Sequence, residues 1–205
     1  MTDLPPLRYL SAADVAAAMP DLPERLRLAE ATLRGLAGEA ELPPKIGVHP
    51  REPASFAHAM PAFLPGAAPD GRDDRLGMKW VLGFQDNPGR SLPAIHGLVL
   101  LNDATTGVPT AVLDAGPITA QRTAAVSGVA MRAWAPPVAG RRIHAAIVGA
   151  GVQGHAHLPI LGHVLPGVEV RVFDRDPVRA AALADAALDT AGIAGATVAP
   201  SARDA

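Results

Sequence analysis

The chain contains no cysteine, and this absence excludes several classes of site. Without cysteine there is no disulfide framework, no thiolate ligand for zinc and no cysteine nucleophile. Aromatic residues make up only 3% of the 205 residues, whereas apolar residues reach 49%. A substantial hydrophobic core can therefore form, and it must be built mainly from alanine, valine, leucine and isoleucine.

Clusters of basic charge and long apolar segments are also missing. The formal net charge is -2, and no run of lysine and arginine provides a footprint for nucleic acid or for an anionic membrane surface. No uncharged apolar stretch reaches the roughly 18 residues that a membrane span needs. The segment Met1–Pro6 lacks the basic and apolar regions of a secretory signal. We therefore expect a cytoplasmic protein with no nucleic-acid or membrane partner.

The first part of the chain is predicted to combine helices with consecutive strands. Ser11 and Asp21 are typical helix caps, which predicts helices to about Met19 and to Gly38. Short apolar runs between glycine, proline, asparagine and aspartate then predict strands at Lys45–His49, Phe56–Leu64, Gly77–Phe84, Ile95–Asn102 and Pro109–Asp114. Because no helices separate these strands, the sheet should be mostly antiparallel or mixed. A helix over Ile118–Trp134 and a linker over 135–140 follow.

The most informative segment is Ile143–Gly154, where an apolar strand leads into Gly149-Ala-Gly-Val-Gln-Gly154. A helix and a second strand, Val168–Phe173, follow, and Asp174 ends that strand twenty residues after the last glycine. This context matches the dinucleotide-binding fingerprint of a Rossmann fold. Gly149 permits a tight turn, Gly151 lets a pyrophosphate approach the backbone, and Gly154 lets the helix pack on the strand. The helix N-terminus then offers N–H groups and a partial positive charge to the phosphates.

Asp174 bears on the choice of cofactor. Its carboxylate can accept hydrogen bonds from both ribose hydroxyls and would repel a 2'-phosphate, which favours NAD. The neighbouring Arg175 can pair with a 2'-phosphate, so NADP is the alternative. The predicted cofactor-binding residues are Gly149, Gly151, Val152, Gln153, Gly154, Asp174 and Arg175.

The histidines and serines suggest no further chemistry. His155 and His157 are two positions apart and do not share a helix face, so no metal site is predicted. Ser91 and Ser127 show no recognisable spacing of a nucleophile and a base with the histidines.

Several segments together resemble the ornithine cyclodeaminase / mu-crystallin family. They are Pro43–Pro50, Met60-Pro61, Gly77–Val81, Gly97–Asp103, Ile118–Ser127 and Gly149–Gly154, in this order. The resemblance implies an N-terminal α/β domain for substrate binding and dimerisation with a mixed sheet, over residues 1–137. A truncated Rossmann domain with a doubly wound parallel sheet, binding NAD(P), would occupy residues 138–205. It further implies a homodimeric enzyme that acts on a small amino acid or imine, by oxidative deamination with cyclisation or by imine reduction.

The resemblance also implies roles for basic residues. Lys45, Lys79 and Arg122 match the positions that bind the substrate carboxylate, where charge-assisted donors fix its orientation. Lys79 is the candidate catalytic group for proton transfer. Arg122 and the adjacent Thr123 are further candidates for contact with the cofactor.

One departure from the family concerns length. The chain supplies the first three of six Rossmann strands and no counterpart of the family's acidic catalytic residue, so we expect little turnover of ornithine with NAD by these 205 residues alone. The alternatives are a non-catalytic, mu-crystallin-like protein that binds a dinucleotide and a small ligand, and an inactive fragment.

Overall fold

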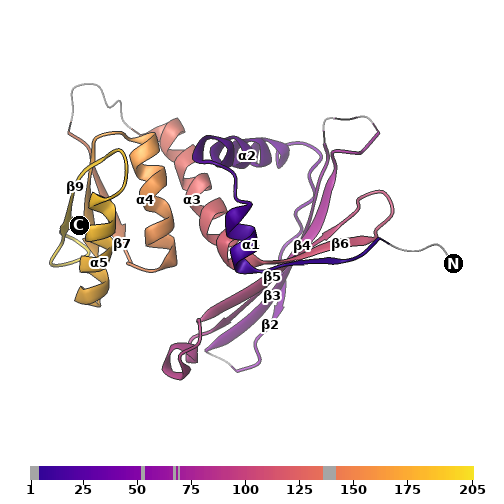
Figure 1. The fold of residues 1–205 in the computed structure, drawn as a ribbon, viewed down its shortest axis with the longest axis horizontal. Coiled ribbons are helices and arrows are strands. Elements are labelled where there is room, and N and C mark those ends of the chain that lie inside the picture. The colour runs from indigo at the N-terminus through magenta and orange to yellow at the C-terminus, as the bar shows by residue number, and fades with distance from the viewer. Residues whose placement is uncertain (1–4, 52–53, 67, 69, 136–141) are drawn as a thin grey trace. The chain divides into compact units, whose positions relative to one another are not determined.

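The computed structural model describes residues 5–51, 54–66, 68, 70–135 and 142–205. The chain divides into two compact units, and both are traced in Figure 1. The first comprises residues 1–19 and 31–119, and the second comprises residues 20–30 and 120–205. The predicted domain boundary between residues 137 and 138, and the linker around it, lie outside the described residues.

The first unit is organised around a six-stranded sheet in the order β1-β6-β5-β4-β3-β2. The strands are β1 (Arg8–Leu10), β2 (Ile46–Val48), β3 (Ser55–Leu64), β4 (Arg75–Phe84), β5 (Ile95–Asn102) and β6 (Pro109–Asp114). β1 pairs with β6 in parallel and every other pair is antiparallel, which confirms the predicted mixed sheet. A 3-10 helix (Asn87–Arg90) lies between β4 and β5.

Two helices precede β2. Helix α1 (Ala12–Ala17) begins with a capping box in which Ser11 and Asp14 bond to each other's backbone N–H. Helix α2 (Leu22–Gly35) ends before the predicted stop at Gly38, because residues 36–39 form turns. A Cβ on Gly35 would come within 2.8 Å of Leu64 Cδ1, so the end of α2 packs closely on β3.

The sheet has two faces of different chemistry. Residues paired across strands point the same way, and successive residues along a strand point to opposite sides. The lysine face carries His58, Met60, Lys79 and Val81, because Met60 pairs with Lys79 and His58 pairs with Val81. The apolar face carries, among others, Tyr9, Ile46, Val48, Trp80, Leu98 and Leu100.

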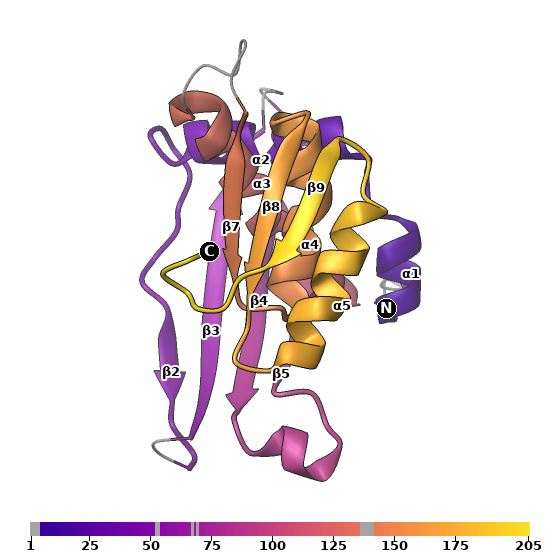
Figure 2. The same cartoon turned by 90° about the vertical axis from the view of Figure 1, so that its left-hand side faces the viewer.

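The second unit contains a three-stranded parallel sheet in the order β7-β8-β9. Its elements are β7 (His144–Val148), α4 (Val152–Val164), β8 (Val168–Phe173), α5 (Pro177–Leu188) and β9 (Ile193–Val198). Figure 2 shows the three strands side by side. This order and alternation reproduce strands 3-2-1 of a doubly wound sheet, as the sequence predicts. The core includes Leu158, Val168, Val170, Val172 and Leu183, all at most 2% exposed.

Helix α3 (Ala115–Trp134) connects β6 to the segment before β7. It begins at Ala115, earlier than the predicted Ile118, because Gly97 leaves room for it. A Cβ on Gly97 would come within 3.1 Å of the Ala115 Cβ. Among the described residues, no helix is long and apolar enough to cross a membrane.

Candidate functional site

The glycine turn between β7 and α4 has the conformation that its sequence predicts. Gly149 has a φ of 107°, in the region that favours glycine, and its N–H donates to the Phe173 carbonyl at 2.8 Å. A Cβ on Gly154 would lie 2.5 Å from the Gly149 carbonyl oxygen, so α4 packs directly against the turn. Gly151 is the N-cap of α4. Because Gly149 and Gly151 carry no side chains, a phosphate can approach the first N–H groups of the helix closely.

Asp174 follows β8 and fixes the turn from the next strand. One carboxylate oxygen accepts a hydrogen bond from Ala150 N at 2.6 Å, and the other accepts one from Asp176 N at 2.9 Å. These bonds, the one from Asp176 first, lower the pKa of Asp174, and Arg179 and Arg175 add to the effect. The carboxylate is therefore ionised at neutral pH, and its oxygens keep lone pairs for a ribose diol.

Two arginines lie near this carboxylate. Arg175 directly follows Asp174 and is exposed. Arg179 lies in the first turn of α5, where Asp176 caps the helix by accepting from the N–H groups of Val178 and Arg179. A Cβ on Gly151 would come within 3.2 Å of Arg179 Nη2, so this guanidinium lies beside the glycine turn. Arg179 is not among the cofactor-binding residues predicted from the sequence, because its approach to the glycine turn depends on where α5 begins.

Helices α3 and α4 run in the same direction side by side. Ser127 contacts His157, a Cβ on Gly128 would contact Ile160, and Arg132 Nη2 lies 3.3 Å from His163 Nε2. These pairs keep an almost constant offset along the chain, as parallel helices require. Arg122 and Thr123 lie about one turn before Ser127, which puts them level with the start of α4. Arg122 is exposed and Thr123 is half-buried.

A contact between Ser127 and His157 joins the two helices and was not visible in the sequence. His157 Nε2 lies 2.9 Å from Ser127 Oγ, and His157 Nδ1 lies 2.6 Å from the Gln153 carbonyl. The residues are distant in sequence, so only the helix packing brings them together. Ser127 Oγ also donates to the Thr123 carbonyl at 3.3 Å, and the contact thus connects the two helices.

The predicted carboxylate-binding lysines belong to the first unit. Lys45 is exposed and directly precedes β2, while Lys79 is half-buried in β4. Ile46 pairs with Ala59 and Lys79 pairs with Met60, so continuing the β2 register puts Lys45 across from Met60. Lys45 and Lys79 therefore flank Met60 from its two sides on the lysine face, with β3 between them. Arg122 belongs to the second unit.

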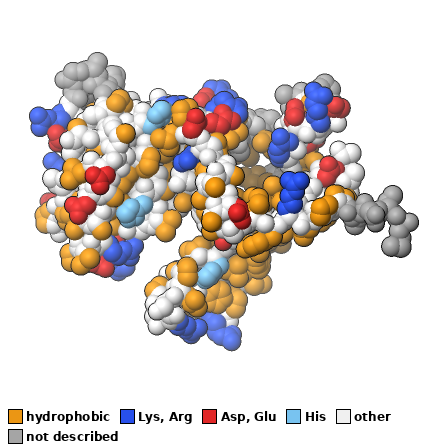
Figure 3. Space-filling model, viewed as in Figure 1, with side chains coloured by type: hydrophobic (Ala, Val, Ile, Leu, Met, Phe, Trp, Pro, Cys, Tyr) orange, Lys and Arg blue, Asp and Glu red, His pale blue; other side chains and the backbone are white. Residues whose placement is uncertain are grey.

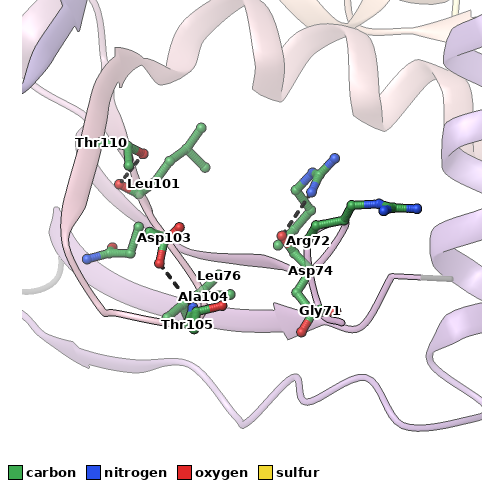
Figure 4. Close-up of a pocket in the computed structure, with 11 residues that line it drawn as sticks. Gly71, Arg72, Asp74, Leu76, Leu101, Asp103, Ala104, Thr105 and Thr110 are labelled. Atoms are coloured by element: carbon green, nitrogen blue, oxygen red, sulfur yellow. Dashed lines mark hydrogen bonds between the residues drawn. The ribbon is translucent and has the colours of Figure 1, made fainter. Parts of the chain in front are cut away.

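One surface hollow of the first unit contains none of the predicted site residues. This cavity of about 250 Å³ is formed by the turns before β4 and after β5, as Figure 4 shows. Its charged groups are already bonded locally: Arg72 pairs with Asp70, and Asp103 accepts from Thr106 Oγ1 at 2.6 Å. In the described parts of the chain, no group of three or more histidine, aspartate or glutamate residues could hold a metal ion.

Comparison with known proteins identifies the family in which this arrangement occurs. The model of the ornithine cyclodeaminase/mu-crystallin family matches residues 10–205. The nodulation efficiency protein NfeD of Rhizobium meliloti is 42% identical over 172 residues, which are 83% of this chain and 51% of that protein. The chain thus spans about half the length of this relative.

Solved structures show the same architecture. The Δ1-pyrroline-2-carboxylate reductase of Thermococcus litoralis, in complex with NADH and L-proline, superposes with a TM-score of 0.83 at 29% identity, covering 96% of this chain and 58% of that chain. An archaeal alanine dehydrogenase dimer with bound NAD gives a TM-score of 0.80 at 29% identity, covering 95% and 56%. The fold, the glycine turn and the matched residues 10–205 show that the chain belongs to the ornithine cyclodeaminase/mu-crystallin family.

Proposed function

We propose that the chain forms the substrate-binding and dinucleotide-binding parts of an NAD(P)-dependent enzyme that acts on a small amino acid or its imine. The observation that carries this proposal is the glycine turn held by Asp174, with Gly149 at positive φ and Gly151 as an N-cap that places no side chain on the start of α4. The bound NADH and NAD in the two structural relatives support NAD as the cofactor. The reaction class is oxidative deamination, with or without cyclisation, or imine reduction.

Each proposed role follows from the position of the residue. Arg122 and Thr123, level with the start of α4, would contact the cofactor together with the glycine turn, Val152, Gln153, Asp174 and Arg175. Lys45, Lys79 and Arg122 would bind the substrate carboxylate, a role that the family resemblance implies for all three. Lys79 is proposed for proton transfer, since it is half-buried on the lysine face. We further propose residues 1–137 and 138–205 as the two functional domains.

A homodimer is proposed from the apolar face of the six-stranded sheet. Tyr9, Ile46 and Val48 on this face are 66%, 70% and 60% exposed, and Leu98 is 41% exposed. Figure 3 shows hydrophobic side chains gathered over the strands labelled β2, β3 and β5 in Figure 1. Large exposed apolar patches usually mark interaction surfaces, and the alanine dehydrogenase relative is a dimer. A second copy is therefore the proposed partner for this face.

The cofactor proposal is tested by titrating the chain with NADH and NADPH and following nicotinamide fluorescence. We expect saturable binding of NADH, tighter than that of NADPH. The substitution Gly151→Val should weaken NADH binding at least about tenfold, since its side chain would fill the place of the pyrophosphate. The matched control is Gly195→Ala in β9, where a Cβ meets only Glu169 Cγ at 3.8 Å. Unchanged binding by Gly151→Val would contradict the proposal.

The enzymatic proposal is tested separately from binding. A panel of amino acids and cyclic imines is incubated with NAD or NADH, and the near-ultraviolet absorbance of the reduced nicotinamide is followed. We expect hydride transfer with at least one member of the panel, with little on ornithine, and we expect Lys79→Ala to abolish this transfer while NADH binding persists. Dinucleotide binding without turnover on any member of the panel would favour a non-catalytic binding protein.

A further inference from the structure

His58 lies on the lysine face in the row next to the two lysines. Met60 pairs with Lys79, and His58, two residues earlier on β3, pairs with Gly47 on β2 and Val81 on β4. Positions two apart on a strand project from the same face about 7 Å apart. The imidazole of His58 therefore stands beside Lys79 and on the same side of the sheet. From the sequence alone, His58 is expected to be a packed or pocket-lining strand residue rather than a ligand.

The His58 ring is held in place by its neighbours. It stacks on the Phe56 ring with centroids 4.5 Å apart and an interplanar angle of 23°. The His49 ring meets it edge-on at 6.1 Å. A Cβ on Gly47 would overlap the His58 ring, so glycine is needed there for the imidazole to lie across β2. A ring fixed on two sides is suited to recognising a ligand group at a defined position.

The surroundings of His58 are positively charged. Partial burial first, then Lys45 and His49, lower the pKa of His58, which places Lys45 close enough to act on the ring. The positions that surround His58 on this face are 45, 47 and 49 in and next to β2, 56, 58 and 60 in β3, 79, 81 and 83 in β4, and 95, 97 and 99 in β5. None of these positions is acidic, and they include two lysines and two histidines.

This distribution has a consequence for the substrate's side chain. A terminal ammonium group, as in ornithine, would meet two ammonium groups and no carboxylate among these positions. A second carboxylate would instead receive charge-assisted hydrogen bonds from an imidazole that takes up a proton as the ligand binds. The row that contains Lys45 and Lys79 and the row that contains His58 are about 7 Å apart. This spacing suits the two carboxylates of a short dicarboxylate.

We propose that His58 is a specificity-determining residue of this site, and that the substrate is an amino or imino acid with a second carboxylate on a short side chain. In this arrangement the lysines bind the α-carboxylate, and His58, assisted by His49, binds the side-chain carboxylate. The inference rests on the proposed function, because it assumes that the lysine face is the carboxylate-binding surface.

Calorimetric titration of the 205-residue chain with L-aspartate, L-alanine and L-ornithine tests this assignment. We expect L-aspartate to bind at least about tenfold more tightly than L-alanine, and L-ornithine more weakly than both. The affinity for L-aspartate should rise as the pH falls toward the protonation of His58, as the linkage of binding to proton uptake requires. The imidazole Cε1 proton signal of His58 should also shift on addition of L-aspartate in NMR spectra.

Two substitutions separate charge from structure. His58→Gln keeps a polar side chain and should lose both the preference for L-aspartate and its pH dependence. His58→Glu should reverse the preference toward L-ornithine. The control His155→Gln changes an exposed histidine on α4 and should leave amino-acid binding unchanged. Retained aspartate preference in His58→Gln, no preference in the parent chain, or no amino-acid binding at all would overturn the inference.

NADH binding, measured in parallel, keeps the two proposals distinct. If NADH and L-alanine bind but L-aspartate has no advantage, the inference about His58 fails and the proposed function stands. If NADH fails to bind the parent chain, the proposed function itself is contradicted.

Discussion

Around the glycine turn, individual atoms decide which residues can be accommodated. A Cβ on Gly154 would meet the Gly149 carbonyl oxygen at 2.5 Å, Leu183 Cδ2 at 3.0 Å and Ile147 Cγ2 at 3.4 Å. Asp174 connects the turn to β8 through Ala150 N. These contacts combine packing, hydrogen bonding and charge within one turn, and each can be tested by a single substitution.

The packing at Gly154 leads to a prediction about stability. Gly154→Ala should destabilise the chain by about 1–3 kcal/mol, because a methyl group would force α4 away from the turn. The midpoint of urea unfolding measures this loss. The control Gly195→Ala introduces the same methyl group where only ordinary contact at 3.8 Å awaits it, and should change stability by about 0.5 kcal/mol or less. Equal losses of unfolding free energy in the two variants would show that the glycine turn accommodates the methyl group at little cost.

The hydrogen bonds of Asp174 lead to a prediction about pH. Its pKa is lowered in the folded chain, so its contribution to stability is present above the unfolded value of about 3.9 and is lost as the pH falls through the folded value. The stability difference between the parent chain and Asp174→Asn should therefore be largest at neutral pH and shrink below about pH 4. Urea unfolding across this range measures it, with the exposed Asp185→Asn as control. A difference that stays constant with pH would contradict the role of the carboxylate charge.

Single residues also show what could be predicted from the sequence. Gly149, Gly154 and Asp174 were predictable, because the dinucleotide fingerprint demands those residue types at those spacings. Arg179 and His58 were not identified, because their positions depend on how α5 begins and on the register between β2 and β3. A sequence pattern along one segment carries little information about register between segments.

At the scale of elements, the parallel pair of α3 and α4 supports the cofactor-binding end of the second unit. The pair shares a small buried cluster of Leu26, Ala120, Ala124, Ala156 and Ile160. Small residues let the helices approach closely, and the contact of Ser127 with His157 adds a polar connection at the interface. Arg122 and Thr123 depend on this packing for their position beside the start of α4.

A double-mutant cycle measures the polar connection. Ser127→Ala and His157→Leu should each destabilise the chain, and together they should cost less than the sum of the two, with a coupling of about 0.5–1.5 kcal/mol. Urea unfolding of the four proteins gives the coupling directly. A control cycle pairs Ser127→Ala with the exposed His155→Leu and should be additive. A coupling of zero in the first cycle would show that the contact between Ser127 and His157 contributes nothing to stability.

The elements themselves were largely predictable from the sequence. The bounds of β5, β6 and β8 match the expected ranges, because glycine, proline and aspartate stand at or next to their ends. Helix α2 ends at Gly35 rather than at the predicted Gly38. Glycine at either position is compatible with a helix end, and the close packing of Gly35 on Leu64 is tertiary information that the sequence does not carry.

At the scale of the whole molecule, the chain joins a mixed sheet with an apolar face to a parallel sheet that carries the glycine turn. The apolar face was not visible in the sequence, because its residues come from all six strands and alternate with those of the lysine face. Periodicity predicts that a strand has two different sides, but not which one is covered.

The dimer proposal can be tested on this face. Leu98 is paired with Trp80 on the apolar face, so Leu98→Glu would introduce a charge at its centre. We expect the parent chain to sediment as a dimer and the variant as a monomer with unchanged circular dichroism. Val178→Glu, at a 76% exposed position of α5, is the control and should remain dimeric. A monomeric parent chain, or a dimeric Leu98→Glu variant, would rule out this surface.

The bond between Asp174 and Ala150 N has a further consequence for the speed of cofactor capture. The carboxylate holds the turn through a hydrogen bond within the chain itself, so few backbone torsions have to be ordered during the encounter. Ordering a mobile loop would lower the apparent affinity by the fraction of time that the loop is competent. With the turn already formed, association should follow second-order kinetics up to high NADH concentration. Differences in cofactor affinity among variants should then appear mainly in how long the nucleotide stays bound.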